Sequence, residues 1–185
     1  MSDNVMDQKT QTTEDAQFVT LGIDREVFAV PVEAVLEILD MRPVFRVPDA
    51  PPYLAGLIDV RGRGVPVIDL RVKLGLPSVA ATEHTRVIVL EISLKGRQLV
   101  LGLIADRVFE VAALNAEQIT PPPDIGVTWR SDYIRGVAHS GESFVVIFDL
   151  VRLFSGDEII ALDKSGSQNR DPATNAIQSP AAAVA

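Results

Sequence analysis

The sequence contains no cysteine and only two histidines, so it lacks side chains on which several kinds of chemistry depend. Without cysteine there is no disulfide framework, no thiolate zinc site and no cysteine nucleophile. His84 and His139 stand at no recognisable catalytic spacing from a serine or a carboxylate, and no H-x-x-H, EF-hand or phosphate-loop motif occurs. We therefore expect a protein that is not an enzyme, with no catalytic residue, no metal site and no cofactor.

Clustered basic residues and long apolar runs are missing too. The chain has 17 Lys and Arg against 25 Asp and Glu, and no two basic residues are adjacent. Nucleic acid requires clustered cations to neutralise its phosphates. The densest apolar run, Leu99–Ala105, is far shorter than the roughly 18 residues of a spanning helix, and the polar N-terminus has no signal-peptide core. We expect a soluble cytoplasmic protein that binds no nucleic acid and meets a membrane only through a partner.

The two ends of the chain differ in composition from its middle. Residues 1–16 are polar and without periodicity, and residues 165–185 are small, polar and proline-containing. Such segments bury too little apolar surface to offset the entropy lost on ordering, so we predict two disordered tails. The remaining unit, 17–164, belongs to a chain that is 47% hydrophobic, enough for a sizeable core.

Within this unit the apolar residues form short runs rich in Val and Ile, separated by Gly, Pro, Asp and Asn, a pattern typical of strands and tight turns. We predict strands at Phe18–Ile23, Val27–Val30, Val65–Ile68, Arg86–Ile92, Leu99–Ile104 and Phe144–Phe148. Glycine tolerates positive φ, which favours hairpin turns at Lys95–Gly96 and Ser140–Gly141. We predict short helices at Val32–Glu37, after Pro51–Pro52, at Asp69–Leu74 and at Asp149–Phe154. Aspartate is a good N-cap for the last two.

The sequence also repeats itself. Tyr53–Leu74 aligns without a gap on Tyr133–Phe154, 80 residues further on, with a tyrosine, a glycine and an Asp-Leu pair in common. Phe28–Leu39 matches Leu101–Ala112 at a shift of 73 residues (Val35 to Val108). Two matched blocks in the same order favour a duplicated unit of roughly 70 residues and about five strands, the size of a small barrel. Chance similarity between valine-rich strands is the alternative.

The turn inside the first block is not shared by the second. Asp59–Gly64 reads DVRGRG, whereas the aligned His139–Phe144 reads HSGESF and contains no arginine. Residues that both copies share are expected to serve the fold that the copies have in common. Residues found in only one copy can serve a function that this copy alone performs. The arginines are therefore either solvating groups on a turn or an interface, because arginine is enriched at interfaces and turns often carry function.

The stretch Pro48–Pro77, PDAPPYLAGLIDVRGRGVPVIDLRVKLGLP, resembles the CheW-type chemotaxis coupling proteins. Their pattern runs from a proline-rich lead through G-x-I-N-L-R-G to V-P-I-x-D-L-R-x-x-L. The resemblance extends over nearly all of Gln17–Asp163, including the early FxLGIDxExFAVPVExVLEI and the late Y-I-x-G. Asp59-Val60 stands here in place of the usual Asn-Leu, while Arg61-Gly62 is intact.

The resemblance implies a mainly β fold of two intertwined SH3-like five-stranded barrels that share a core, with short helices. It implies a non-catalytic adaptor that couples the cytoplasmic tip of methyl-accepting chemoreceptors to the regulatory domain of the histidine kinase CheA. Residues at positions linked to this coupling are Val35, Glu37, Ile38, Gly56, Arg61 and Val108.

A receptor tip is helical, and a helix binds by laying an apolar face into a groove. The groove between the barrels would be formed by Val35, Ile38, Leu57, Val108 and Val111, although for any single one of them ordinary core packing is the commoner explanation. At its rim we predict an ion pair between Glu37 and Arg61, beside Gly62. The alternatives are an adaptor of a non-flagellar chemosensory pathway, a small-ligand-binding β-barrel and an unrecognised hydrolase.

Overall fold

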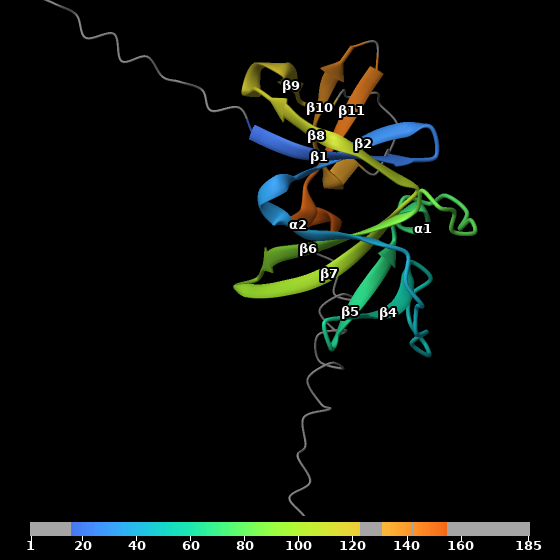
Figure 1. Ribbon diagram of the computed structural model, residues 1–185. Helices are drawn as coiled ribbons and strands as arrows, with labels where there is room; N and C mark the ends of the chain where they lie inside the picture. The colour runs from blue at the N-terminus through green and yellow to red at the C-terminus, as the bar shows by residue number, and fades with distance from the viewer. Residues whose placement is uncertain (1–15, 123–130, 142, 155–185) are drawn as a thin grey trace, which may run out of the picture.

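The computed structural model describes residues 16–122, 131–141 and 143–154, which form strands joined by tight turns and short helical turns (Figure 1). The strands are β1 (Ala16–Ile23), β2 (Glu26–Pro31), β3 (Val35–Asp40), β4 (Leu54–Val60), β5 (Arg63–Asp69), β6 (Arg86–Leu94), β7 (Arg97–Ala105), β8 (Arg107–Leu114), β9 (Ile119–Thr120), β10 (Ile134–Ser140) and β11 (Ser143–Phe148). The helical turns are η1 (Val32–Ala34), α1 (Leu70–Lys73), η2 (Ala116–Gln118), η3 (Ser131–Tyr133) and α2 (Leu150–Leu153).

The strands form two curled sheets, which lie in the upper and lower halves of Figure 1. The six-stranded sheet has the order β8-β1-β2-β11-β10-β9, and the five-stranded sheet has the order β3-β6-β7-β5-β4. We refer to them as the six-stranded barrel and the five-stranded barrel. Each contains one parallel pair, β2 with β11 and β5 with β7, among antiparallel neighbours. The predicted pair of SH3-like barrels is confirmed.

The strand orders show that the repeat is real and that its two copies are intertwined. Strands β3, β6, β7, β5 and β4 occupy the same successive positions in one sheet as β8, β1, β2, β11 and β10 in the other. The first copy therefore gives β1 and β2 to one barrel and β3 to β5 to the other, and the second copy does the reverse. The chain crosses between barrels twice, through η1 and through Asp106.

The sixth strand, β9, is a small departure from the predicted five. It has two residues, which pair with Val137 and Ala138 of β10. At the corresponding place in the five-stranded barrel, Phe45 makes a single antiparallel bridge to Leu57 of β4. The two sheets thus carry equivalent short antiparallel contacts outside β10 and β4, of which one has the length of a strand.

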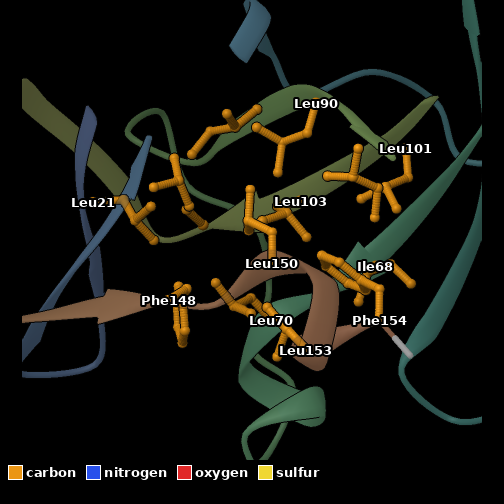
Figure 2. Close-up of a cluster of buried hydrophobic side chains, with 14 of the residues drawn as sticks. Leu21, Ile68, Leu70, Leu90, Leu101, Leu103, Phe148, Leu150, Leu153 and Phe154 are labelled. Atoms are coloured by element: carbon orange, nitrogen blue, oxygen red, sulfur yellow. The ribbon is translucent and has the colours of Figure 1, made fainter. Parts of the chain in front are cut away.

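A central apolar layer lies between the two sheets and receives side chains from both (Figure 2). Alternate residues of β6 point to opposite faces, so Ile88 and Leu90 enter this layer while Val87 and Val89 fill the interior of the five-stranded barrel. In β1, Leu21 enters the central layer and Phe18 the interior of the six-stranded barrel. Strands buried on both faces read as continuous apolar runs, which explains the Val- and Ile-rich segments of the sequence.

The short helices α1 and α2 contribute to the same layer, where Figure 2 shows Leu70, Leu150 and Leu153 converging. Each follows an aspartate that caps it. Asp69 Oδ1 accepts a hydrogen bond from Val72 N at 3.3 Å, and Asp149 Oδ1 accepts one from Arg152 N at 3.0 Å. The predicted helices and caps are confirmed. The shared tyrosines have a matching role, since the backbone oxygens of Tyr53 and Tyr133 accept hydrogen bonds from the two capping aspartates.

Two predicted helices are wrong. The segment Val32–Glu37 is helical only over Val32–Ala34, and Val35 begins strand β3, because the β-branched residues that follow pair with β6. After Pro51–Pro52 there is a turn in which Leu54 N donates to Pro51 O, and β4 begins there.

Of the two predicted limits of the folded unit, only the N-terminal one falls within the described residues. Ala16, assigned to the N-terminal tail, begins β1. The rest of that tail and residues 155–185, which contain the predicted end of the folded unit and the C-terminal tail, lie outside the described residues, so these assignments stay predictions.

We expect Asp69→Ala and Asp149→Ala each to lower the free energy of unfolding by about 1 kcal/mol, because each removes a helix N-cap. Asp69→Ala has the larger effect, since Asp69 Oδ2 also accepts a hydrogen bond from Ser78 Oγ at 2.8 Å. Urea denaturation measures both. The control is Glu83→Ala in an exposed loop, which should stay within about 0.5 kcal/mol of the parent. Equal stability of all three variants would contradict the caps.

Candidate functional site

The first candidate feature is the turn between β4 and β5. Val60 pairs with Arg63, so Arg61 and Gly62 form a two-residue hairpin loop. Their φ angles are 54° and 80°, and positive values at both positions are what a type I′ turn requires. Asp59 Oδ1 accepts a hydrogen bond from Gly62 N at 2.7 Å. The aspartate that replaces the usual asparagine of the motif therefore still fixes this turn.

The turn places Arg61 across the seam of the five-stranded barrel. Its Nη2 atom lies 3.2 Å from Glu37 Oε2 on β3, and β3 and β4 are the two opposite edges of that sheet. The predicted ion pair is confirmed. The Arg61 side chain is 81% exposed and that of Glu37 25%, so the pair contributes only about 0–1 kcal/mol to stability. Its effect is on orientation, because it fixes a guanidinium on an open surface.

A second candidate feature is an apolar row on β3. Val35 pairs with Leu90 and Ile38 with Ile88, and directly opposed residues of an antiparallel pair project to the same face. Leu90 and Ile88 belong to the central layer. Val35 packs against that layer, whereas Ile38 is 42% exposed at its margin.

The equivalent strand β8 carries the equivalent row in the other barrel. Val108 pairs with Leu21 and Val111 with Val19, both of which belong to the central layer. Val108 packs against the layer and Val111 is 56% exposed. The four predicted valine and isoleucine positions thus lie along the margins of the layer between the barrels, two of them half-buried and two exposed.

The nine predicted coupling residues do not form a single cluster. Glu37, Leu57, Arg61 and Gly62 belong to the seam and hairpin of the five-stranded barrel, whereas Val108 and Val111 belong to the six-stranded barrel. Leu57 is 36% exposed beside Phe45. The site is therefore an extended surface of strand edges and one turn.

Gly56 has a different position from the other eight residues. It is buried in β4 with φ at 144°, and a Cβ atom there would lie 2.2 Å from the backbone oxygen of Phe45. Gly136 in the second copy has the corresponding place beside β9, where a Cβ would meet Ile119 Cγ2 at 2.6 Å and Thr120 O at 2.9 Å. The glycine shared by both copies is therefore explained by the close approach of neighbouring backbone in each barrel.

Three exposed apolar residues beside these positions were missed by sequence reasoning: Leu36 (53% exposed), Phe45 (65%) and Phe109 (51%). Leu36 and Phe109 are equivalent in the two copies, and each lies where the edge strand has a register shift against its neighbour. Recognition of β3 as a strand would have placed Leu36 beside Ile38. Phe45 lies in a proline-flanked segment with no periodicity, so the sequence gives no signal for it.

A cavity of about 530 Å³ lies elsewhere, between the segment that follows β3, helix α1 and the chain before β6. None of the nine predicted residues lines it. Two of its charged groups have partners within the protein, since Asp69 binds Val72 N and Ser78, and Arg71 binds Asp24 and Asp106.

The histidines show no catalytic arrangement. His84 is exposed beside Glu83, and the ring of exposed His139 lies 4.4 Å from that of Phe144. In the part of the chain that the structure describes, no three His, Asp or Glu side chains are grouped so as to hold a metal ion. Among the same residues, no helix is long and apolar enough to cross a membrane.

Fold and surface together define a protein of two intertwined small barrels whose distinctive residues lie on strand edges and one arginine turn. The CheW-like domain family matches residues 17–158, and the chain belongs to that family.

Relatives and a solved structure agree with this assignment. The chemotaxis protein CheW of Klebsiella aerogenes is 34% identical over 147 residues, which cover 80% of this chain and 86% of that protein. The Bacillus subtilis chemotaxis protein CheW is 31% identical, covering 84% and 92%. The crystal structure of the scaffolding protein TtCheW from Thermoanaerobacter tengcongensis superimposes with a TM-score of 0.68 at 26% identity, covering 78% of this chain and 95% of that one.

The two glycines of the candidate site differ in what a substitution should do. We expect Gly56→Ala to lower the free energy of unfolding by more than about 2 kcal/mol, because the new Cβ overlaps Phe45 O. A Cβ at Gly62 meets no other atom, so Gly62→Ala should lower the free energy of unfolding only by the cost of its positive φ, about 1 kcal/mol. Denaturant titration of both variants checks this. Comparable losses in the two would contradict the assignment of Gly56 to the fold.

Proposed function

We propose that this protein is a non-catalytic chemotaxis adaptor that links the cytoplasmic tip of chemoreceptors to the regulatory domain of the histidine kinase CheA. The names of the relatives, chemotaxis protein CheW and a scaffolding protein, support the adaptor role. The protein then works in the cytoplasm and meets the membrane only through the receptors. An adaptor needs surfaces, and three of the nine predicted residues, Ile38, Leu57 and Val111, are exposed apolar side chains.

The observation that carries the proposal is the Arg61–Glu37 pair. It occupies an exposed turn on a barrel seam, and the aligned turn of the second copy has Gly141 in place of the arginine. A framework used twice needs no such difference for its own stability, because an exposed pair contributes little. Arginine offers a planar fork of donors that suits recognition of a carboxylate or a backbone oxygen. The pair is therefore best explained as part of an interface.

The apolar rows supply the complementary part of that interface. Ile38 and Leu57 lie on strands that flank the seam, and Val35 is half-buried at the start of the same strand as Ile38. A helical receptor tip presents an apolar stripe, for which exposed aliphatic side chains are the matching surface. The row of Val108 and Val111 on β8 is the second proposed contact, on the other barrel. We assign the coupling function to these residues with Glu37, Arg61 and Gly62, and Gly56 supports them through the fold.

Reconstitution tests the proposal directly. Chemoreceptor signalling fragments and CheA are mixed with and without this protein, and kinase autophosphorylation is measured. We expect receptor-dependent stimulation only when the protein is present. A mixture that stimulates the kinase equally without it, or a protein that captures neither partner, would refute the adaptor role. The alternative is that the protein is an adaptor of a non-flagellar chemosensory pathway. In that case we expect stimulation with the receptors and kinase of that pathway and none with those of the flagellar pathway.

We expect Arg61→Ala to leave the thermal midpoint within about 2 °C of the parent and to weaken assembly of the receptor–kinase complex several-fold. The first expectation follows from the small energy of an exposed pair, and the second from loss of the oriented guanidinium. The matched control is Arg63→Ala, an exposed arginine two residues along the same hairpin, which should assemble normally. Unchanged melting together with unchanged kinase stimulation by Arg61→Ala would contradict the role.

A further inference from the structure

Arg71 of α1 makes a connection between the two barrels that the coupling surface described above does not include. Its side chain is only 11% exposed, and each of its three nitrogens has an acceptor. Nε donates to Pro77 O at 3.0 Å, Nη1 to Asp106 Oδ2 at 2.6 Å, and Nη2 to Asp24 Oδ1 at 3.3 Å. The guanidinium therefore joins the end of β5, the turn between β1 and β2, and the crossover from β7 to β8.

The two aspartates are also joined to each other's segments. Asp24 N donates to Asp106 Oδ2 at 2.7 Å, and Asp106 N donates to Gly22 O at 3.1 Å. Burial lowers the pKa of Arg71, but its hydrogen bonds and charge pairing with Asp106 and Asp24 outweigh that effect and raise the pKa overall. The guanidinium thus stays charged and separates two carboxylates that would otherwise repel one another. We call Arg71, Asp24 and Asp106 the inter-barrel clamp.

The clamp is present in one copy of the repeat. The residue aligned with Arg71 in the second copy, 80 positions on, is Val151, an apolar side chain that is 48% exposed. Of the two crossovers between the barrels, the one through Asp106 is therefore attached to a helix by a charged group. The crossover through η1 has no arginine at the equivalent place on α2. The same comparison that distinguishes Arg61 thus distinguishes Arg71.

The position of the clamp relates it to both proposed coupling surfaces. Asp106 directly precedes β8, which carries Val108 and Val111 and is an edge strand with β1 as its single neighbour in the sheet. Arg71 follows β5, which begins just after the Arg61 turn. One guanidinium therefore connects the element that ends the arginine hairpin to the start of the apolar row on the other barrel.

We propose that Arg71 is a positioning residue, which holds the arginine hairpin of the five-stranded barrel and the β8 row of the six-stranded barrel at one fixed spacing. It acts through the clamp and not by contact with a partner. This inference rests on the proposed adaptor function for its consequence, but the spacing itself is a property of the protein alone. Without Arg71, the carboxylates of Asp24 and Asp106 face each other unneutralised, and their repulsion loosens the crossover.

The absence of cysteine allows the spacing to be measured. Arg63→Cys and Ala113→Cys place spin labels on exposed positions of the two barrels, next to the hairpin and on β8. Pulsed electron–electron double resonance should give one narrow distance distribution for the doubly labelled protein with Arg71 intact. The distribution should be broader when Arg71→Met is added to the same labelled protein. Adding Asp106→Asn to Arg71→Met should narrow the distribution again, because neutralising one of the two carboxylates removes their repulsion. An unchanged distribution in Arg71→Met would overturn the proposal.

Binding is measured separately on unlabelled protein, with a chemoreceptor cytoplasmic fragment as the probe. We expect Arg71→Met to weaken binding about tenfold, within the range for residues that act without touching the ligand. The control is Arg25→Met, an exposed arginine next to Asp24 in the turn between β1 and β2 and no member of the clamp, which should leave both distance and binding unchanged. Loss of thermal stability with parental binding at a temperature well below the melt would show that the clamp only stabilises.

Two results would prevent a direct reading of these experiments: misfolding of Arg71→Met, and failure of the parent protein to bind the receptor fragment. If Arg71→Met does not fold, Arg71→Lys keeps a positive charge but has no planar fork to hold Pro77 O and both carboxylates at once, so it should still broaden the distance distribution. If the parent protein binds no receptor fragment, the adaptor proposal fails, while the distance measurement still decides whether the clamp sets the spacing. A broad distribution in the parent itself contradicts the clamp, whatever the binding result.

Discussion

The structure depends on one apolar layer that neither barrel can form alone. Leu21 of β1 and Ile88 of β6 are fully buried in it, and they belong to different sheets. Each buried side chain of this size contributes roughly 1.5–3 kcal/mol relative to exposure, so the layer outweighs any surface contact. Because both copies of the repeat supply it, the chain must cross between the sheets twice. Those crossings determine where the edge strands β3 and β8 begin.

The apolar pattern predicted most of this architecture, and the reason is visible in β6. Strands with two buried faces are apolar throughout, and a run such as Arg86–Ile92 is then unmistakable. The Asp69 and Asp149 caps are local signals and were predicted for the same reason. Strand β3 is not predictable in this way, since the sequence of residues 32–37 is compatible with a helix as well as with a strand. Pairing with β6 selects the strand from Val35 onward.

The candidate site was predicted less completely than the fold. Arg61 and Glu37 were paired from the motif, and the structure confirms their contact. Exposure of Phe45 depends on a bridge to a strand beyond a proline-rich segment, which no local pattern encodes. The partners of Arg71 lie 35 and 47 residues away along the chain, so their convergence is a property of the folded topology. Single-sequence reasoning finds caps and turns well because both are local, and contacts of this kind are not.

The intertwining also constrains the order in which the molecule can be completed. Strand β2 needs β11 as its parallel neighbour, with Val27 opposite Val145, so the first hairpin has its partner only after nearly all of the folded chain has been synthesised. The five-stranded barrel, by contrast, has all its strands once β7 is made. During synthesis the β1–β2 hairpin therefore presents an unpaired edge and an uncovered apolar face for most of the translation time. Strand pairs that are far apart in sequence form slowly, and until they form the chain exposes apolar surface that is prone to aggregation. Exchange of strands between the two copies thus makes β10–β11, the last hairpin of the described residues, the element that protects the first.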